Sequence, residues 1–218
     1  MSAAVHPLAG PIALLAREVS GVQVRWAGCR PAARQRIYFA NHTSHLDFVV
    51  LWSALPRDVR RLALPVAAED YWDTGIRGYL AQSVFHAILV RRRGPAEQLG
   101  VAEALAESCR MIDRLAEAMG TTHSLILFPE GTRGNGETIG AFRSGLYYLA
   151  QKRPDLELVP VYLDNLSRIL PKGEVLPVPL LSRLTFGEPI QLEGAETKAM
   201  FLERARAAVQ ALSRRDRS

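Results

Sequence analysis

The stretch RIYFANHTSHLDFVVLWSAL, residues 36–55, predicts a strand, a polar turn and a helix in direct succession. Residues 36–40 form a short apolar run of strand length, and residues 47–55 form an apolar helical segment that Pro56 ends. The polar turn between them reads NHTSHLD, residues 41–47, and carries two histidines and an aspartate. Side chains that can ionise or bind metal therefore follow directly on a buried strand.

The rest of the chain repeats this alternation of strand-like and helix-like segments. We predict further strands at residues 22–26, 60–67, 86–90, 124–128, 156–163 and 183–190. We predict further helices near residues 9–19, 70–82, 95–119, 144–152 and 195–213. Pro65 should interrupt the strand at residues 60–67. Strands that alternate with helices predict an α/β fold, a single domain with a mostly parallel central sheet flanked by helices.

The composition is that of one ordinary globular domain with an excess of positive charge. The chain has 218 residues, of which 48% are hydrophobic and 22% charged, with a net charge of +5 and an isoelectric point near 9.6. The excess charge favours anionic partners: phosphorylated ligands, an acidic carrier protein or an anionic membrane face. The sequence shows neither a basic helix nor basic residues interleaved with aromatic ones, which argues against nucleic acid. Arginine greatly outnumbers lysine, as expected of a GC-rich bacterial genome.

The N-terminal segment and the cysteines bear on the location of the protein. Residues 1–21 predict one apolar helix that contacts a membrane surface, and the segment lacks the basic start of a signal peptide. No window reaches the roughly 18 uncharged apolar residues that a spanning helix needs. Cys29 and Cys109 are isolated, so we expect two free thiols in a reducing compartment, with a disulfide as the alternative. The sequence predicts a soluble or peripheral protein.

His42 and Asp47 are five residues apart, so on one helix they would point to different faces. They can meet if His42 lies in the turn and Asp47 in the first turn of the helix. One interpretation is structural, with Ser44 capping the helix and Asp47 completing a capping box. The other is a dyad, in which the carboxylate fixes the imidazole tautomer and the histidine takes a proton from a hydroxyl group. A zinc site is disfavoured, because His42 and His45 have no further ligands at metal-binding spacing.

A second motif, SLILFPEGTR at residues 124–133, supplies the anion site that would favour the dyad. A buried strand runs into a turn in which Gly131 allows close backbone approach. Thr132 offers a hydroxyl group, and Arg133 offers a planar guanidinium suited to phosphate oxygens. The alternative is an ordinary glycine turn with a surface arginine. Both motifs begin where a predicted strand stops, and ligands gather at the carboxyl ends of parallel strands. We therefore expect the two motifs to form one site.

Together the two motifs resemble those of the glycerolipid acyltransferases, a family typified by lysophosphatidate acyltransferase. NHTSHLD resembles the family's His-x4-Asp motif, and FPEGTR, residues 128–133, resembles its second signature. AILVRRR, residues 87–93, and LELVPVYLDN, residues 156–165, resemble two further blocks. The resemblance implies an acyltransferase core at residues 22–193. Residues 194–218 would then be a C-terminal helix and basic tail packed on the same domain.

The resemblance also implies roles for individual residues. His42 would be the general base, and Asp47 would be its orienting partner. The implied substrate-binding residues are Arg92, Glu130, Gly131, Thr132, Arg133 and Arg143. Residues 130–133 would form a loop around the acceptor phosphate, and Arg92, or alternatively Arg91 or Arg93, would be a second phosphate contact. No metal and no cofactor is implied, since the acyl donor, acyl-CoA or acyl-carrier protein, is a substrate.

The implied reaction moves a fatty acyl group from an acyl thioester to the hydroxyl group of a lysophospholipid, most simply 1-acylglycerol-3-phosphate to phosphatidate. The sequence departs from the family at LPVAAEDYW, residues 64–72, which lacks a lysine that the family often has there, and at Arg91, which replaces an acidic residue. These departures concern the acceptor, so glycerol 3-phosphate or an amine-bearing lyso-lipid is an alternative. A non-catalytic anionic-lipid-binding module and a metal-dependent hydrolase are alternatives from other classes.

The expected partners are the lysophospholipid and acyl thioester substrates, an anionic membrane surface and, as one candidate, an acyl-carrier protein. We expect a cytoplasmic protein, peripheral on the inner face of a bacterial cell membrane. The Leu/Ala pattern of residues 99–118 is interpreted as core packing rather than a lipid groove. The Pro-rich residues 169–181 are interpreted as a packed connection.

Overall fold

Strands and helices alternate along the chain in the computed structural model, which describes residues 6–44, 46–91, 100–134, 136, 138–166 and 181–215. The strands are β1 (Gln23–Trp26), β2 (Arg36–Ala40), β3 (Ala63–Ala68), β4 (Ile88–Val90), β5 (Ser124–Leu127), β6 (Glu157–Asp164) and β7 (Arg183–Phe186). The helices are α1 (Ala9–Ser20), α2 (Asp47–Ala54), α3 (Arg57–Arg60), α4 (Glu69–Trp72), α5 (Gly75–Tyr79), the π-helical turn η1 (Leu80–Val84), α6 (Val101–Met119), α7 (Gly145–Lys152) and α9 (Lys198–Arg215).

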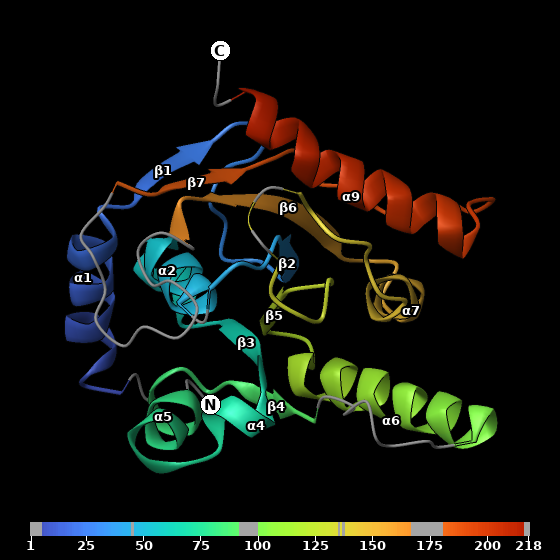
Figure 1. Ribbon diagram of the computed structural model, residues 1–218, viewed down its shortest axis with the longest axis horizontal. Helices are drawn as coiled ribbons and strands as arrows, with labels where there is room; N and C mark the ends of the chain where they lie inside the picture. Colours follow the sequence, from blue (N-terminus) through green and yellow to red (C-terminus); the bar gives the residue numbers. More distant parts are fainter. Residues whose placement is uncertain are drawn as a thin grey trace.

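The strands form one seven-stranded sheet in the order β1-β7-β6-β2-β5-β3-β4, with β2 at its centre (Figure 1). β2 pairs in parallel with β5 and β6, and β3 pairs in parallel with β5 and β4. β7 pairs antiparallel with β6 and parallel with β1, so these two outer strands run against the others. The predicted α/β fold with a mostly parallel sheet is confirmed. The carboxyl ends of the parallel strands meet at one edge of the sheet, where the polar motifs follow.

Alternate residues of the central strand are buried on opposite faces of the sheet. In β2, Tyr38 and Ala40 pack on the face that α1 and α2 cover, whereas Ile37 and Phe39 pack on the face that α6, α7 and α9 cover (Figure 1). All residues of β2 are buried. This two-sided burial explains why the strand reads as a continuous apolar run. Each large apolar side chain buried in this way contributes about 1.5–3 kcal/mol to stability.

The strand that contains Pro65 and the helix predicted at residues 70–82 differ from their predictions. Pro65 does not interrupt the strand, because β3 pairs with β5 from Ala63 to Pro65 and with β4 from Val66 onward. The proline nitrogen, which cannot donate a hydrogen bond, lies just before the pairing with β4 begins. The helical stretch predicted at residues 70–82 is divided into α4, α5 and η1. Gly75 begins α5 with a left-handed backbone, φ 59°, and so changes the chain direction between α4 and α5.

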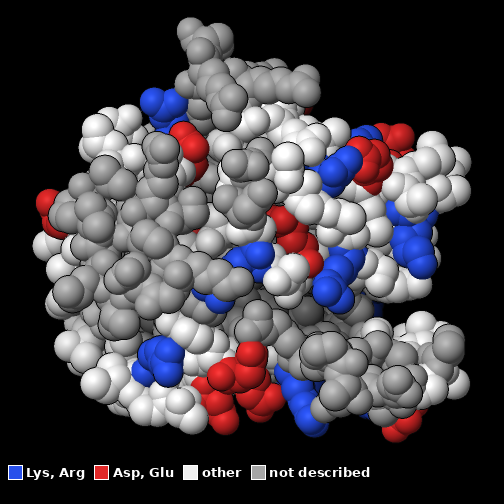
Figure 2. Space-filling model, in the orientation of Figure 1, with Lys and Arg blue, Asp and Glu red and all other residues white. Residues whose placement is uncertain are grey.

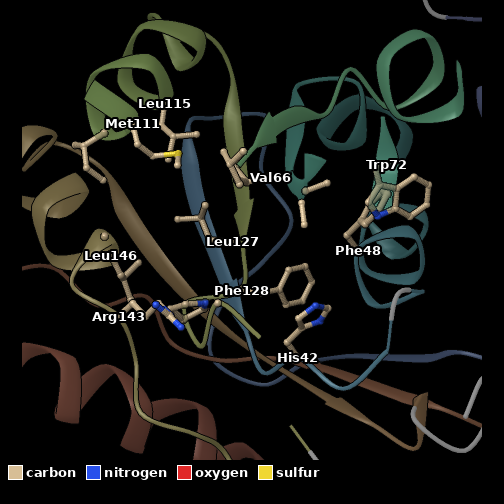
Figure 3. Close-up of a pocket in the computed structure, with 17 residues that line it drawn as sticks. His42, Phe48, Val66, Trp72, Met111, Leu115, Leu127, Phe128, Arg143 and Leu146 are labelled. Carbon is tan, nitrogen blue, oxygen red and sulfur yellow. The ribbon is translucent and has the colours of Figure 1, made fainter. Parts of the chain in front are cut away.

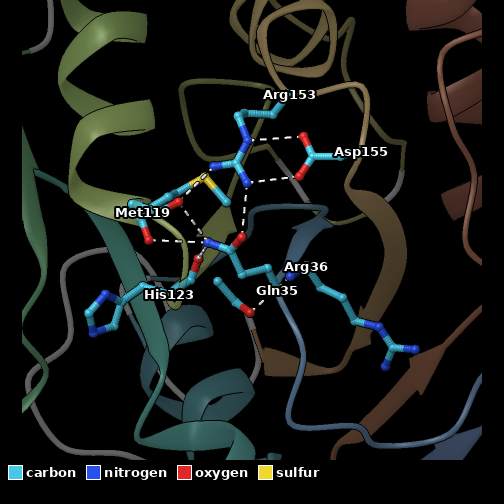
Figure 4. A network of polar contacts seen from close by, with 8 residues as sticks. Gln35, Arg36, Met119, His123, Arg153 and Asp155 are labelled. Carbon is cyan, nitrogen blue, oxygen red and sulfur yellow. Dashed lines mark hydrogen bonds and ion pairs between the residues drawn. The ribbon is translucent and has the colours of Figure 1, made fainter. Parts of the chain in front are cut away.

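A polar network ties α6 and α7 to the start of β2 (Figure 4). Gln35 directly precedes β2, and its Nε2 donates to the carbonyl oxygens of Met119 and Gly120 at 3.2 and 3.0 Å. Arg153 directly follows α7 and donates to Gln35 Oε1 and to Gly120 O, both at 2.9 Å. Its ion pair with Asp155 holds the pKa of that carboxyl group below its ordinary value. The network fixes both helices against the central strand, and both helices border the site described below.

The ends of the described chain pack on the same sheet. α1 packs against α2, and α9 packs against β6 and α7. No helix within the described residues is both long enough and apolar enough to cross a membrane. The helix predicted from residue 95 begins at Val101 in the described chain, and residues 92–99 lie outside the described residues. His45 and almost all of the Pro-rich residues 169–181 also lie outside them.

Candidate active site

His42 and Asp47 are in direct contact where β2 passes into α2. His42 Nδ1 lies 2.8 Å from Asp47 Oδ2, and the Asp47 side chain is fully buried. The contact arises as the spacing requires, since His42 is in the turn after β2 and Asp47 is the first residue of α2. A carboxylate that accepts from Nδ1–H leaves Nε2 as the nitrogen that can take a proton. Within the described residues, Nε2 of His42 has no hydrogen-bond partner of its own.

The same carboxylate organises the turn before α2. Asp47 Oδ2 accepts hydrogen bonds from the backbone N–H groups of Thr43 and Ser44, at 2.6 and 2.9 Å. The bond from Ser44 N–H is one half of a capping box. The other half is missing, because Ser44 Oγ accepts from Leu46 N–H, at 3.3 Å, rather than from Asp47 N–H. The geometry thus agrees with both interpretations: Asp47 contacts His42, and it also accepts backbone hydrogen bonds at the start of the helix.

Glu130 joins the two motifs through their backbones. Its buried carboxylate accepts from His42 N–H at Oε1 and from Gly140 N–H at Oε2, both at 2.8 Å. Gly134 N–H in turn donates to the His42 carbonyl oxygen at 2.8 Å. The loop after β5 therefore holds His42 by both of its backbone groups. The resemblance implies a place for Glu130 around the acceptor phosphate, whereas here both carboxylate oxygens bind backbone N–H groups.

Gly131 and Arg143 fit against each other beside this loop. The Gly131 backbone is left-handed, φ 70°, and a Cβ atom there would collide with the Arg143 side chain. Arg143 Nε donates to the Glu130 carbonyl oxygen at 3.2 Å, and Arg143 N–H donates to Pro129 O at 2.8 Å. The guanidinium group is thereby held across the loop, and it borders the same cavity as His42 (Figure 3).

Of the other predicted binding residues, Thr132 and Arg133 are among the described residues and Arg92 is not. Thr132 is exposed and Arg133 is half-buried, and among the described residues the Arg133 side chain has no ion-pair partner. Arg133 directly precedes Gly134, so the bond from Gly134 to His42 brings its backbone next to the histidine. The predicted residues that the structure brings together around His42 are Asp47, Glu130, Gly131 and Arg143.

An apolar cavity of about 220 Å³ opens beside His42. The Phe128 ring lies against the imidazole, with ring centroids 4.6 Å apart (Figure 3). Most of the remaining lining is apolar and includes Phe48, Val66, Trp72, Met111, Ile112, Leu115, Leu127 and Leu146. Such a lining suits a hydrocarbon chain and keeps water away from reacting groups.

The apolar face of α6 belongs to this cavity as well as to the core. Ile112 and Leu115 are buried in the core on that face of the sheet, and with Met111 they also line the cavity. The interpretation of residues 99–118 as core packing alone is therefore incomplete. The helical pattern cannot separate the two roles, because an apolar stripe at the same spacing serves either one.

The described residues show no metal-binding cluster, and the lining described for the cavity beside His42 includes no cysteine. Among the described residues, no group of three or more His, Cys, Asp or Glu side chains is arranged to hold a metal ion. Cys29 and Cys109 are free cysteines, as expected from their isolation in the sequence. Cys29 is half-buried, and this burial raises the pKa of its thiol.

The fold and the site define a class of α/β proteins in which a His–Asp pair and an apolar cavity share the carboxyl edge of a parallel sheet. A family model described as Acyltransferase matches residues 22–164, about two-thirds of the chain, and this range contains both motifs. The chain belongs to this acyltransferase family, and the resemblance to glycerolipid acyltransferases is confirmed.

Individual relatives agree with this family. The chain is 29% identical over 165 residues to a 1-acyl-sn-glycerol-3-phosphate acyltransferase of Limnanthes douglasii. The matched residues are 74% of this chain and 53% of the relative. It is 27% identical over 137 residues to the chloroplastic 1-acyl-sn-glycerol-3-phosphate acyltransferase LPAT1 of Arabidopsis thaliana. The matched residues are 63% of this chain and 34% of that relative. The chain thus spans about half the length, or less, of these relatives. The crystal structure of the 1-acyl-sn-glycerophosphate (LPA) acyltransferase PlsC from Thermotoga maritima has the same fold, with a TM-score of 0.70 at 17% identity over 95% of this chain and 78% of that one.

Proposed function

We propose that this protein transfers a fatty acyl group from an acyl thioester to the hydroxyl group of 1-acylglycerol-3-phosphate, which gives phosphatidate. The observation that carries the proposal is the 2.8 Å contact between His42 Nδ1 and the buried Asp47 carboxylate beside an apolar cavity. Relatives named 1-acyl-sn-glycerol-3-phosphate acyltransferase support the choice of acceptor. Glycerol 3-phosphate is the second candidate acceptor, because the sequence lacks a lysine that the family often has in residues 64–72.

The proposed reaction needs one base and no covalent enzyme intermediate. The acceptor oxygen attacks the thioester carbonyl carbon while its proton passes to Nε2 of His42. Asp47 stabilises the imidazolium that forms, because the carboxylate lies on Nδ1. The tetrahedral intermediate then collapses with cleavage of the C–S bond, and the thiolate takes the proton back from His42. An ester and a free thiol are the products, and the proposed chemistry uses no metal and no cofactor.

The surroundings of His42 supply a place for each part of the substrates. The apolar cavity would hold an acyl chain, with the reacting carbonyl at the imidazole. Arg143 and Arg133 would contact the acceptor phosphate. Arg92, which lies outside the described residues, remains a proposed second contact. A charge-assisted hydrogen bond of this kind is worth about 1.5–3 kcal/mol.

The proposed substrates are lipids, so we also infer that the protein works as a peripheral protein on an anionic membrane surface, on the cytoplasmic face of a bacterial cell. The net charge of +5 supports attraction to such a surface. The same charge would attract an acidic acyl-carrier protein, which we propose as an alternative to acyl-CoA as donor.

The test is an acyl-transfer assay that follows both thiol release and lipid product. Purified protein is incubated with acyl-CoA and, in separate reactions, with 1-acylglycerol-3-phosphate, glycerol 3-phosphate or an unphosphorylated monoacylglycerol. We expect thiol release that depends on the acceptor, is largest with 1-acylglycerol-3-phosphate and is unaffected by EDTA. Release of free fatty acid or phosphate that EDTA abolishes would instead identify a metal-dependent hydrolase. Vesicle binding without any thiol release would identify a non-catalytic lipid-binding module.

A further inference from the structure

A second cavity, of about 340 Å³, lies at the opposite end of β3 from the cavity of His42. Ala63 and Leu64, at the start of β3, line the second cavity, whereas Val66, Ala67 and Ala68, at its end, line the first. The nearest of these residues, Leu64 and Val66, are about 7 Å apart along the strand at roughly 3.3 Å per residue, and the two cavities share no lining residue. The second cavity is therefore a separate site and takes no part in the proposed acyl transfer.

The lining of the second cavity is strongly basic, and we call it the basic pocket. Its charged or ionisable members are His6, Arg57, Arg60, Arg61 and His86, and no acidic side chain among the described residues lines it. Arg57 and Arg61 are exposed, and within the described residues neither side chain has an ion-pair or hydrogen-bond partner. In contrast, basic and acidic side chains are interspersed over the described part of the face shown in Figure 2. Among the described residues that line the basic pocket, all formal charge is thus positive.

Arg60 is held in place, yet its charge is not neutralised. Its Nη1 donates to the Ser53 carbonyl oxygen at 3.2 Å, and its guanidinium carbon lies 4.9 Å from the centroid of the Trp52 ring. Burial, followed by the like charges of Arg17 and Arg57, lowers the pKa of Arg60 below its ordinary value. A bound anion would offset this repulsion and would find the guanidinium group already oriented.

The backbone on one side of the basic pocket has an uncommon conformation. η1 is a π-helical turn, and the exposed His86 follows it with a left-handed backbone, φ 51°. Such conformations are rare outside glycine, cost energy and are concentrated at functional sites. They place the His86 side chain at the basic pocket.

Exposed apolar side chains lie on the elements around the basic pocket. They are Leu8, Leu14, Leu15, Ile76 and Tyr79. Tyr79 OH lies 3.0 Å from Nε2 of His6, which joins α5 to the segment before α1 beside the pocket. Ile76, one turn before Tyr79 on the same side of α5, is 79% exposed, and Leu14 and Leu15 are 61% and 62% exposed. A single exposed leucine is ordinary, but several on α1, which lines the basic pocket, and on α5, which contacts its lining residue His6, indicate contact with an apolar phase.

We propose that the basic pocket binds the phosphate of an anionic membrane phospholipid, while the exposed apolar side chains of α1 and α5 insert among neighbouring lipids. A soluble anion would use the guanidinium groups but not the apolar side chains, whereas a membrane phospholipid uses both. The buried Trp52, Val84 and Phe85 give the pocket an apolar wall that suits the part of a lipid next to its headgroup. This surface gives a place to the membrane association proposed above, and it does not depend on the acyl-transfer chemistry.

The test is co-sedimentation of the full chain with vesicles of phosphatidylcholine alone or of phosphatidylcholine mixed with phosphatidylglycerol. The variant Arg57→Gln/Arg61→Gln removes two exposed arginines of the basic pocket. The control Arg110→Gln/Arg114→Gln removes the same charge from exposed positions on α6. At about 1 kcal/mol for each basic residue at a membrane surface, we expect the first variant to bind mixed vesicles about thirtyfold more weakly. The control should bind like the wild type, and both variants should keep acyl transfer to substrates dispersed in detergent.

Three further variants keep the result interpretable. Leu14→Gln/Leu15→Gln should weaken binding to mixed vesicles, whereas Leu105→Gln/Met200→Gln, at similarly exposed positions on α6 and α9, should not. His42→Ala should bind vesicles like the wild type, so a failure of the acyl-transfer proposal stays distinct from a failure of this one. Equal weakening by both arginine variants would show attraction by net charge alone and would overturn the proposal. Thermal stabilisation by inorganic phosphate without vesicle binding, lost in Arg57→Gln/Arg61→Gln, would assign the pocket to a soluble anion and also overturn it.

Discussion

Asp47 receives three donors on one carboxylate oxygen, namely His42 Nδ1 and the N–H groups of Thr43 and Ser44. Its other oxygen, Oδ1, is buried and has no partner within the described residues. In Asp47→Asn the amide oxygen can keep the three bonds while the NH₂ group takes the place of Oδ1. The negative charge on residue 47 is lost, but the hydrogen bonds that organise the turn before α2 are kept. We expect kcat to fall about 10²–10⁴-fold, because the imidazolium loses its counter-charge.

Thermal unfolding of the same variant separates the two roles of Asp47. We expect a loss of about 1–3 kcal/mol in the free energy of unfolding, as charge-assisted bonds become neutral ones. Ser44→Ala is the matched control, since it removes only the bond from Leu46 N–H to Ser44 Oγ and should leave kcat nearly unchanged. An Asp47→Asn variant that unfolds more easily but turns over like the wild type would reduce Asp47 to a capping residue.

Glu130 acts on His42 through the backbone. In Glu130→Gln, only one side-chain oxygen remains for the N–H groups of His42 and Gly140, so one buried donor loses its acceptor. This should cost about 1–3 kcal/mol of stability and displace His42. We expect kcat to fall while the KM for the acceptor changes little. The steady-state parameters check this, and a changed acceptor KM with an unchanged kcat would place Glu130 on the phosphate instead.

Arg133 is the predicted phosphate contact whose side chain has no ion-pair partner among the described residues. Loss of a charge-assisted contact worth about 1.5–3 kcal/mol should raise the KM for the acceptor about ten- to a hundredfold. Arg133→Ala should therefore weaken the acceptor far more than the acyl donor. Arg110→Ala, on the exposed side of α6, is the control. If Arg133→Ala affects phosphorylated and unphosphorylated acceptors equally, the loop does not bind phosphate.

At the scale of elements, strands buried on both faces are easiest to predict from this sequence. β2 has the bounds predicted for it, because its apolar run stops sharply at the polar Asn41. The segment from α4 to η1 was harder, since the turn at Gly75 and the change to π-helical bonding depend on what the chain packs against. Pro65 misled the prediction, because a proline is tolerated where one neighbouring strand is not yet paired.

The α6 helix allows a prediction about chain length. Leu115 is almost fully buried and lines the cavity beside His42, so Leu115→Trp should fill part of that cavity. If two or three methylene groups lose their place at about 0.8 kcal/mol each, kcat/KM for long-chain thioesters should fall about ten- to fiftyfold. Short-chain thioesters should be used as before. Leu105→Trp, exposed on the same helix, is the control. Equal losses at every chain length would show that the cavity does not hold the acyl chain.

At the scale of the whole molecule, the sequence predicts the contact between His42 and Asp47 better than its surroundings. His42, Asp47 and the loop at residues 130–133 could be found because each motif is contiguous and follows a strand. The apolar cavity could not be, since its lining comes from α2, β3, α6 and α7, whose apolar side chains read as core. The basic pocket joins His6, residues 57–61 and His86, and no local pattern links these segments. The reversed direction of β1 and β7 was likewise not predicted.

The two cavities lie at opposite ends of β3, and a different function is proposed for each. The carboxyl end of β3 lines the apolar cavity that His42 also lines, and the amino end lines the basic pocket. Chemistry and membrane attachment, as proposed, therefore rest on different residues. Variants at one end should leave the other function intact, because the sites share no lining residue.

The central claim is that His42 is the base in an acyl transfer, and turnover of His42→Ala tests it most directly. Thiol release from acyl-CoA in the presence of 1-acylglycerol-3-phosphate is compared between the wild type and this variant, with circular dichroism as a check of folding. A positioned general base typically contributes about 10²–10⁴-fold, so the variant should retain at most about one hundredth of the wild-type kcat. A folded His42→Ala protein that releases thiol and forms phosphatidate at the wild-type rate would contradict the claim.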